Sequence, residues 1–262
     1  MRPEAGASPR DRRLAGWLGL ALLLPPLGLA LAALALGKPS IGPMLSPPSL
    51  AHPLGTDDLG TDMLVLLAQG ALVSFAIGGT ATLLALALGG VLGLCAAFGG
   101  RLADDLVMRA AEITVTVPPL LLAVVLVSLL GSGPLLTAAA LGFGAWPMVG
   151  RVTRAAAFGM RGQPHLLSAR ALGLSLPRIA VRHVLPAILP VVLSLTGVLF
   201  SGAVLAEATL SFVGLTDHAM PGWGHLMAHA GPYLRDAWWM WLFPGMLLIM
   251  ATAGVALLAD TP

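Results

Sequence analysis

Two histidines placed four residues apart are the clearest candidates for metal ligation in this sequence. His225 and His229 fall in a polar segment, and a helix would place both on one face. Imidazole binds nickel, zinc or copper well. Two ligands do not complete a site, however, and a histidine pair at a surface equally suits contact with another protein. We therefore predict no metal site and keep His225 and His229 as weak candidates.

Other reactive residue types are too rare for catalysis. The single Cys95 excludes a disulfide framework or a cysteine-based metal site. The only lysine, Lys38, precedes Pro39, so the chain has no phosphate-binding P-loop. Carriers coupled to ions normally keep ionisable groups within the membrane, and here Glu207 is almost alone among the apolar segments. The sequence predicts a chain that is not an enzyme and binds no cofactor, with energy supplied by a partner.

The composition predicts an all-α polytopic membrane protein. Of its 262 residues, 57% are hydrophobic and only 10% are charged, whereas soluble domains carry about 25% charged residues. The mean hydropathy is +0.91. A net charge of +2 with one Tyr and one Lys also excludes the basic aromatic surfaces that bind nucleic acid.

Six segments are apolar enough to cross a bilayer, which takes roughly 20 residues. We predict spans over residues 14–36, 72–98, 113–130, 135–149, 185–205 and 239–258. The first is longer than the apolar region of a signal peptide, about 7–15 residues, so we expect it to be retained. The domain plan is a tail (1–13), the first span (14–36), an outer loop with lead-in (37–71), a five-span core (72–258) and a short end (259–262).

The basic residues predict which way the spans face. With the N-terminus inside, the outer face holds only Lys38 and Arg235, and the inner face holds the other twelve basic residues: Arg2, Arg10, Arg12, Arg13, Arg101, Arg109, Arg151, Arg154, Arg161, Arg170, Arg178 and Arg182. Cytoplasmic loops carry such an excess, so we expect both termini in the cytoplasm. Tyr233, Trp238, Trp239 and Trp241 would then form an aromatic belt at the outer interface.

The inner loop at 151–184 contains the signals of a short helix. Gln163-Pro164 can open it, because Pro is tolerated in the first helical turn, and Gly173 suits its end. A second helix is expected to start near Leu176-Pro177 and to continue into the fifth span. A short helix held between two spans at the membrane surface can be bound and displaced by another protein.

Three separated motifs resemble the second permease of dipeptide, oligopeptide and nickel importers of the ATP-binding cassette (ABC) class. Residues 169–173 (ARALG), followed by 182–186 (RHVLP) and Pro190, resemble the EAA loop of these permeases. HPLGTDDLGTD at 52–62 resembles the outer motif HPLGTDxxGRD. AEATLSFVGL at 206–215 with Trp223-Gly224 resembles AEAxLSFLGLG…WG. The match covers nearly the whole chain and implies the type I importer permease fold.

The chain departs from the family pattern at three places. The Glu-Ala-Ala of the loop is Leu167-Ser168-Ala169 here, so its acidic residue is missing. The Arg of the outer motif is Thr61, and the charged tail of the family stops at Asp260-Thr261-Pro262. The first departure bears on how strongly the loop docks, rather than on where it docks.

The resemblance implies a subunit for ATP-driven peptide uptake across the bacterial inner membrane. Implied partners are a second permease forming a heterodimer, two ABC ATPase subunits that bind ATP and Mg, an external substrate-binding protein and the lipid bilayer. A nickel or metal-chelate importer of the same family is the nearest alternative. A stand-alone carrier or channel, or a membrane enzyme, would need coupling or catalytic residues that the spans lack.

The resemblance also assigns two groups of site residues. The coupling loop that contacts the ATPase would comprise Gln163, His165, Leu167, Ser168, Ala169, Arg170, Ala171, Leu172, Gly173, Leu185 and Pro186. Candidates for the translocation path or outer gate are Glu207, Ser211, Phe212 and Trp223. For Glu207, a capping carboxylate at the head-group level is the alternative to binding a peptide amino terminus, pairing with the partner permease or supporting the gate.

Overall fold

The computed structural model describes residues 9–35, 40–131, 133–216 and 221–259, with side chains from residue 13 onward. Within these ranges the chain is helical apart from turns, loops and two isolated bridges, Ile41–Thr61 and Thr56–Asp62. The all-α prediction is therefore confirmed. Residues 1–8 and 260–262 of the predicted tails lie outside the described ranges, as does Lys38.

Five helical segments in the described part of the chain are long and apolar enough to cross a membrane. They are α1 (Pro9–Ala32), α2 (Met63–Phe98), α5 (Pro134–Met160), the run Leu176–Leu193 and α11 (Trp239–Ala259). A sixth forms if the bent pair α3 (Gly100–Thr116) and α4 (Pro119–Leu130) counts as one span. The predicted count of six thus holds only with this pair included.

The third span is not the straight helix predicted over 113–130. Helix α3 already begins at Gly100, and its axis makes an angle of 85° with that of α4. The break lies at Val117, which is extended (φ −93°, ψ 126°) because the residue before a proline is pushed out of the helical region. The charged residues Arg101, Asp104, Asp105, Arg109 and Glu112 lie along α3.

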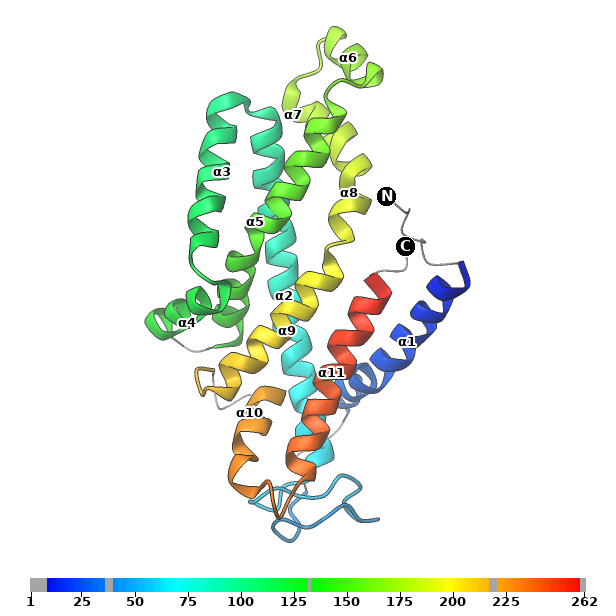
Figure 1. The fold of residues 1–262 in the computed structure, drawn as a ribbon, viewed down its shortest axis with the longest axis vertical. Helices are drawn as coiled ribbons and strands as arrows, with labels where there is room; N and C mark the ends of the chain where they lie inside the picture. The colour runs from blue at the N-terminus through cyan, green and yellow to red at the C-terminus, as the bar shows by residue number, and fades with distance from the viewer. Residues whose placement is uncertain (1–8, 36–39, 132, 217–220, 260–262) are drawn as a thin grey trace, which may run out of the picture.

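The fifth span also differs from its prediction over 185–205. The helical run comprises α7 (Leu176–Ile179), a π-helical turn η1 (Ala180–Val184) and α8 (Leu185–Leu193). A break at Ser194-Leu195 separates it from the shorter apolar helix α9 (Thr196–Phe212). The predicted segment therefore spans parts of two helices, and Figure 1 shows that α9 takes a different direction from α8.

Helices α2 and α5 form the centre of the fold through small residues. A Cβ added to Gly89 would lie 2.5 Å from Cβ of Val149, and one added to Gly93 would lie 2.6 Å from the carbonyl oxygen of Gly150. Only glycine permits this approach, as is common where membrane helices pack closely. With 36 residues, α2 is about 54 Å long, and so it exceeds the thickness of the hydrocarbon core.

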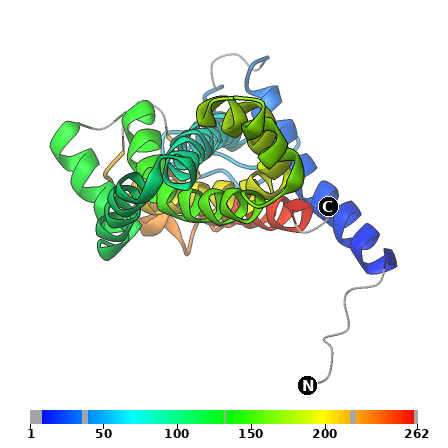
Figure 2. The ribbon, with the colours of Figure 1, turned by 90° about the horizontal axis from the view of Figure 1, so that it is seen from above.

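The connecting segments lie at the two opposite ends of the molecule. Figure 1 shows α6 (Pro164–Ala171) and α7 at one end, and α10 (Trp223–His229) with the loop 40–62 at the other. Seen along the long axis in Figure 2, α1 and α11 lie on one side of the α2–α5 pair and α3 on the other. The structure therefore separates the coupling-loop candidates from the outer-motif residues by the full length of the fold.

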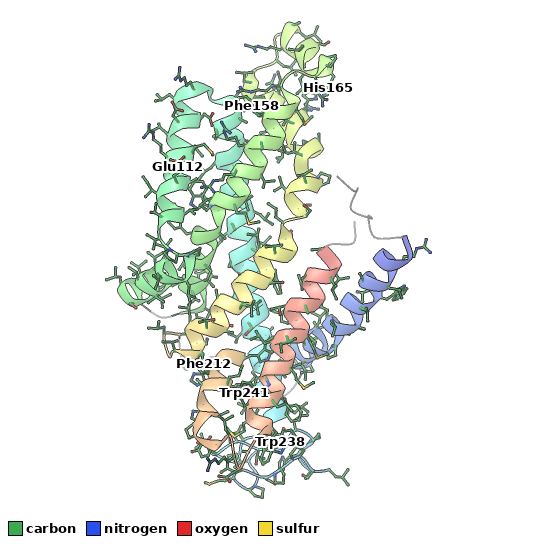
Figure 3. All side chains as sticks on the ribbon, in the orientation of Figure 1. Glu112, Phe158, His165, Phe212, Trp238 and Trp241 are labelled. Carbon is green, nitrogen blue, oxygen red and sulfur yellow. The ribbon has the colours of Figure 1, made fainter. Side chains whose placement is uncertain are left out.

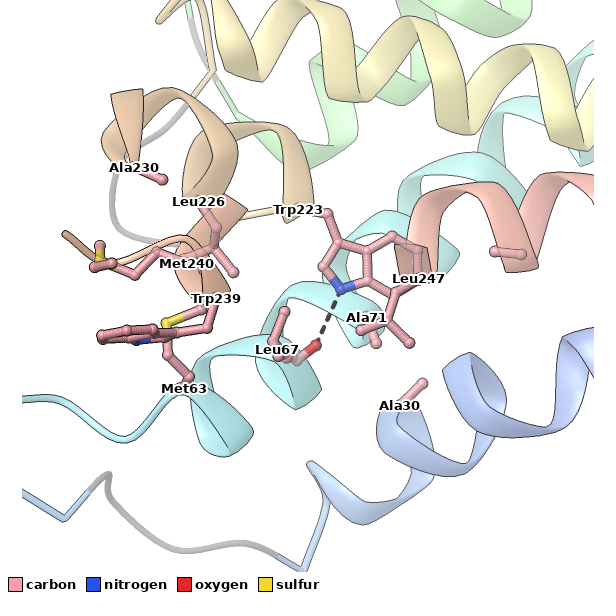
Figure 4. Close-up of a cluster of buried hydrophobic side chains, with 12 residues drawn as sticks. Ala30, Met63, Leu67, Ala71, Trp223, Leu226, Ala230, Trp239, Met240 and Leu247 are labelled. Carbon is pink, nitrogen blue, oxygen red and sulfur yellow. Dashed lines mark hydrogen bonds between the residues drawn. The ribbon is translucent and has the colours of Figure 1, made fainter. Parts of the chain in front are cut away.

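A buried cluster at the α10 end joins α1, α2, α10 and α11. Trp223 is completely buried in it, and its indole Nε1 donates a hydrogen bond to the carbonyl oxygen of Leu67 over 3.1 Å (Figure 4). Trp239 is 3% exposed and belongs to the same cluster. It is therefore a core residue, and the predicted aromatic belt was wrong at this position. Trp238 and Trp241 are exposed at the start of α11, as Figure 3 shows.

Candidate functional site

Helix α6 forms where the sequence predicted a short helix. Gln163 precedes it in an extended conformation, and Pro164 is its first residue. At the other end, the N–H groups of Gly173 and Leu174 donate to the carbonyl oxygens of Arg170 and Ala169. This closing turn requires φ +84° at residue 173, which glycine adopts without steric cost.

One face of α6 is anchored and the other is exposed. Leu166 is 4% exposed and packs in a cluster with Ala157, Ile179 and Val184, against which Ala169 also lies. Most other residues predicted for the coupling loop are exposed on this short segment: Gln163, His165, Leu167, Ser168, Arg170, Ala171, Leu172 and Gly173. Figure 3 shows His165 at the tip of the molecule. Leu185 and Pro186 lie apart from them, in the first turn of α8.

The segment 151–184 around α6 carries basic but no acidic residues. It contains Arg151, Arg154, Arg161, Arg170, Arg178 and Arg182 and no Asp or Glu. Arg154 forms a bidentate ion pair with Asp104 of α3. The guanidinium carbon of Arg161 lies 4.3 Å from the ring centre of Phe158 and 5.3 Å from that of Phe98. The charge of Arg161 is therefore held against two aromatic faces.

At the opposite end, the motif at 52–62 folds into a cap on α2. Asp62 is the N-cap, and its carboxylate accepts hydrogen bonds from the Leu64 N–H (2.8 Å) and contacts Nδ1 of His52 (2.9 Å). The carboxylate of Asp57 accepts from the N–H groups of Leu59 and Thr61. Only the backbone of Thr61 makes this contact, so the change from the Arg of the family pattern leaves the cap intact.

Glu207 is buried beside the start of α10, toward the end of the fold opposite α6. It is 1% exposed, and its two carboxylate oxygens accept hydrogen bonds from Ser74 of α2 (2.9 Å) and Ser211 of α9 (2.7 Å). Gly222 lies so close that an added Cβ would be 2.5 Å from Oε1. The structure therefore brings two of the four predicted gate residues, Glu207 and Ser211, into one hydrogen-bonded group.

The other two gate candidates lie elsewhere. Phe212 ends α9 and is 52% exposed (Figure 3). Trp223 points into the buried cluster, away from solvent. No sequence pattern indicates Ser74, which approaches Glu207 from 133 residues away. Only the folded arrangement of α2 and α9 reveals this partner.

The histidine pair lies on α10 at the same end. The rings of His225 and His229 stack at 6.2 Å, and Nε2 of His229 contacts the Asp58 carboxylate at 3.0 Å. The Tyr233 hydroxyl donates to the same carboxylate, whose negative charge raises the pKa of Tyr233. No group of three or more metal-ligand side chains occurs within the described residues. These contacts join the α10 region to the cap at 52–62.

An apolar cavity of about 570 Å³ opens between α2, α5 and α9. Small residues line much of it, among them Ala81, Gly144, Gly202 and Ala203, and Arg151 lies among the lining residues of α5. No side chain of the described chain fills this volume. This hollow is flanked by the central helices and is a structural candidate for one wall of a passage.

Comparison with known proteins identifies the fold. Residues 89–260 match the family described as the binding-protein-dependent transport system inner membrane component. The chain belongs to this family. It is 36% identical to a protein of Brucella suis biovar 1 named as a peptide transport system permease, over 98% of this chain and 91% of that one. A di/tripeptide transport system permease of Pseudomonas aeruginosa is 35% identical over 79% of this chain and 69% of its own length.

Membership of this family explains the scarcity of reactive groups. An inner membrane component of a binding-protein-dependent system is the permease part of that system, not its ATPase. The matched range 89–260 includes α6, Glu207 and α10, so all the candidate residues beyond the outer cap belong to the shared region. The resemblance drawn from the three motifs is therefore confirmed at the level of the family.

Proposed function

We propose that the chain is the permease subunit of an ATP-driven importer of peptides, in which α6 is the coupling helix. The observation that carries this proposal is the position of α6. It stands at one extreme end of the molecule, anchored by Leu166 and otherwise exposed. The names of the relatives in Brucella suis and Pseudomonas aeruginosa, both peptide permeases, support the substrate class.

Two ABC ATPase subunits binding ATP and Mg would lie beneath α6, and a second permease would complete the pathway as a heterodimer. The excess of arginine at the α6 end supports a cytoplasmic position for that end, with both termini inside. The cap at 40–62 and α10 would then meet an external substrate-binding protein. The apolar cavity between α2, α5 and α9 is the face on which we place the second permease.

Movement would pass from α6 to the core through packed side chains. Leu166 belongs to the same buried cluster as Ile179 of α7 and Val184, and Val184 is the residue before α8. Displacement of α6 by closure of the ATPase dimer would therefore move the α7–α8 run, and α9 after it. The hydrogen bond from Ser74 to Glu207 links α2 to α9 near the outer end, so movement at the inner face would reach the outer one as a shift between two states.

Uptake in cells tests the function. A strain lacking this gene, supplied with labelled dipeptides, should recover uptake with the intact gene and not with one whose residues 163–173 are replaced by an equally long Gly-Ser segment. A variant Arg178→Ala, altered in the same loop outside α6, should restore uptake as the intact gene does. Recovery of nickel uptake without peptide uptake would overturn the peptide assignment.

A further inference from the structure

A cavity of about 280 Å³ lies directly beside α6. Leu166 and Ile179 line it, as does Phe98 from the end of α2. Arg161 and Arg170 also line it, which gives an apolar hollow two positive charges. Neither arginine forms an ion pair with any residue that the structure describes, and the nearby Asp104 pairs with Arg154 instead.

The surface around this cavity is apolar as well as basic. Leu167 is 53% exposed and Leu172 is 82% exposed. Leu167 occupies the position where the family that this chain resembles carries glutamate, so the loop has exchanged an acidic group for an apolar one. An exposed leucine pair beside two arginines favours a partner that offers apolar contacts together with negative charge.

We propose that the ATPase surface that receives α6 is acidic, and that one of its carboxylate side chains enters this cavity to pair with Arg161 and Arg170. The inference rests on the proposed function, because it assumes that α6 docks on an ATPase. Guanidinium groups bind carboxylates through two parallel hydrogen bonds, and Arg161 is already held in place by Phe98 and Phe158. Less side-chain freedom is therefore lost on binding.

The exposed leucines beside the cavity favour a protein over a lipid head group as the source of the negative charge. Figure 1 shows α6 beyond the ends of α2 and α3, which meet at the inner end of the core. The cavity extends from that junction, where Phe98 and Gly100 line it, to α6 at the tip. The exposed Leu167 and Leu172 would find no apolar contact in water there, whereas a protein groove covers them.

The test measures how much ATPase co-purifies with the intact chain in detergent. Arg170→Glu should weaken binding by at least about tenfold, because it places two carboxylates together in a partly desolvated contact. Arg178→Glu, an exposed arginine of the same loop outside the cavity, is the matched control and should bind within about twofold of wild type. High salt should weaken the wild-type complex and have less effect on Arg170→Glu.

Leu167→Glu tests whether the ATPase surface that receives α6 is acidic. It restores the family's glutamate at an exposed position, so folding should be unaffected, and we expect weaker binding because the carboxylate would face an acidic groove. Binding that is unchanged or stronger would overturn the inference. So would equal losses for Arg170→Glu and Arg178→Glu.

Three further outcomes separate the sources of error. If the wild type and the charge variants bind equally but the 163–173 replacement does not, the acidic groove is wrong while the proposed function stands. If the wild type binds no ATPase, the proposed function itself fails. If Arg170→Glu keeps the ATPase but loses co-purified phosphatidylglycerol, the cavity binds a lipid head group and the inference is overturned.

Discussion

The hydroxyl of Ser74 on α2 donates a hydrogen bond to Oε2 of Glu207 on α9 over 2.9 Å. Both side chains are buried, and Ser211 donates to the second carboxylate oxygen. A buried carboxylate is costly unless its oxygens are paired. The two serines therefore allow Glu207 to lie buried near α10, where its bond to Ser74 joins α9 to the central helix α2.

Loss of Ser74 should destabilise the protein measurably. Ser74→Ala leaves one oxygen of Glu207 without its partner, which costs about 1–3 kcal/mol. Thr209→Ala is the control, because the Thr209 hydroxyl is exposed and bonds only within α9; its cost should stay below about 0.5 kcal/mol. Thermal unfolding in detergent measures both, and equal losses would show that the buried bond contributes nothing.

Alanine substitution at two adjacent glycines of α2 should have different effects on stability. A Cβ at Gly89 meets Val149 at 2.5 Å, whereas one at Gly90 meets nothing within 4 Å. Gly89→Ala should cost about 1–3 kcal/mol through overpacking, and Gly90→Ala should be neutral or stabilising by up to about 1 kcal/mol. Stability of the two purified variants checks this. A harmless Gly89→Ala would contradict the close α2–α5 contact.

Trp239 should matter through its hydrogen bond as well as its bulk. Its Nε1 donates to the carbonyl oxygen of Thr56 over 3.0 Å, so Trp239→Phe leaves that buried oxygen unpaired at a cost of about 1–3 kcal/mol. Trp241→Phe, at a 42% exposed position, should change stability much less. Protease digestion of the 40–62 cap in intact membranes should be faster only for Trp239→Phe.

The glycine that ends α6 should be needed for coupling. Gly173 has φ +84° and an open surrounding, so Gly173→Ala meets no steric clash but pays about 1–2 kcal/mol for a left-handed conformation. We expect reduced peptide uptake with normal membrane insertion. Gly162→Ala, also in open space but without positive φ, should leave uptake unchanged. Equal uptake by both variants would mean that the α6 closing turn is dispensable.

Elements governed by local signals could be predicted from the sequence. Gln163-Pro164 and Gly173 bound α6 as expected, because caps and helix breakers act within a few residues. Long apolar stretches located α1, α2 and α11 for the same reason. The third span differs from its prediction over 113–130 because Pro118 holds Val117 in an extended conformation, which breaks the helix there.

Features set by tertiary packing could not be predicted. Trp239 has the residue type and position of an interface anchor, and only its contact with Thr56 shows that it is buried. Glu207 stood out as an acidic group among apolar residues, but Ser74 could not be assigned to it from a distance of 133 residues. Burial and long-range pairing depend on how the helices meet, which spacing along one helix does not encode.

The most direct test of the account is co-purification of the full chain from detergent-solubilised membranes, with residues 163–173 either intact or replaced by an equally long Gly-Ser segment. We predict that the intact chain brings down a P-loop ATPase and a second multi-span permease. The replaced chain should lose the ATPase and keep the permease, since the proposed permease contact lies on α2, α5 and α9. Retention of the ATPase by the replaced chain would contradict the assignment of α6 as the coupling helix.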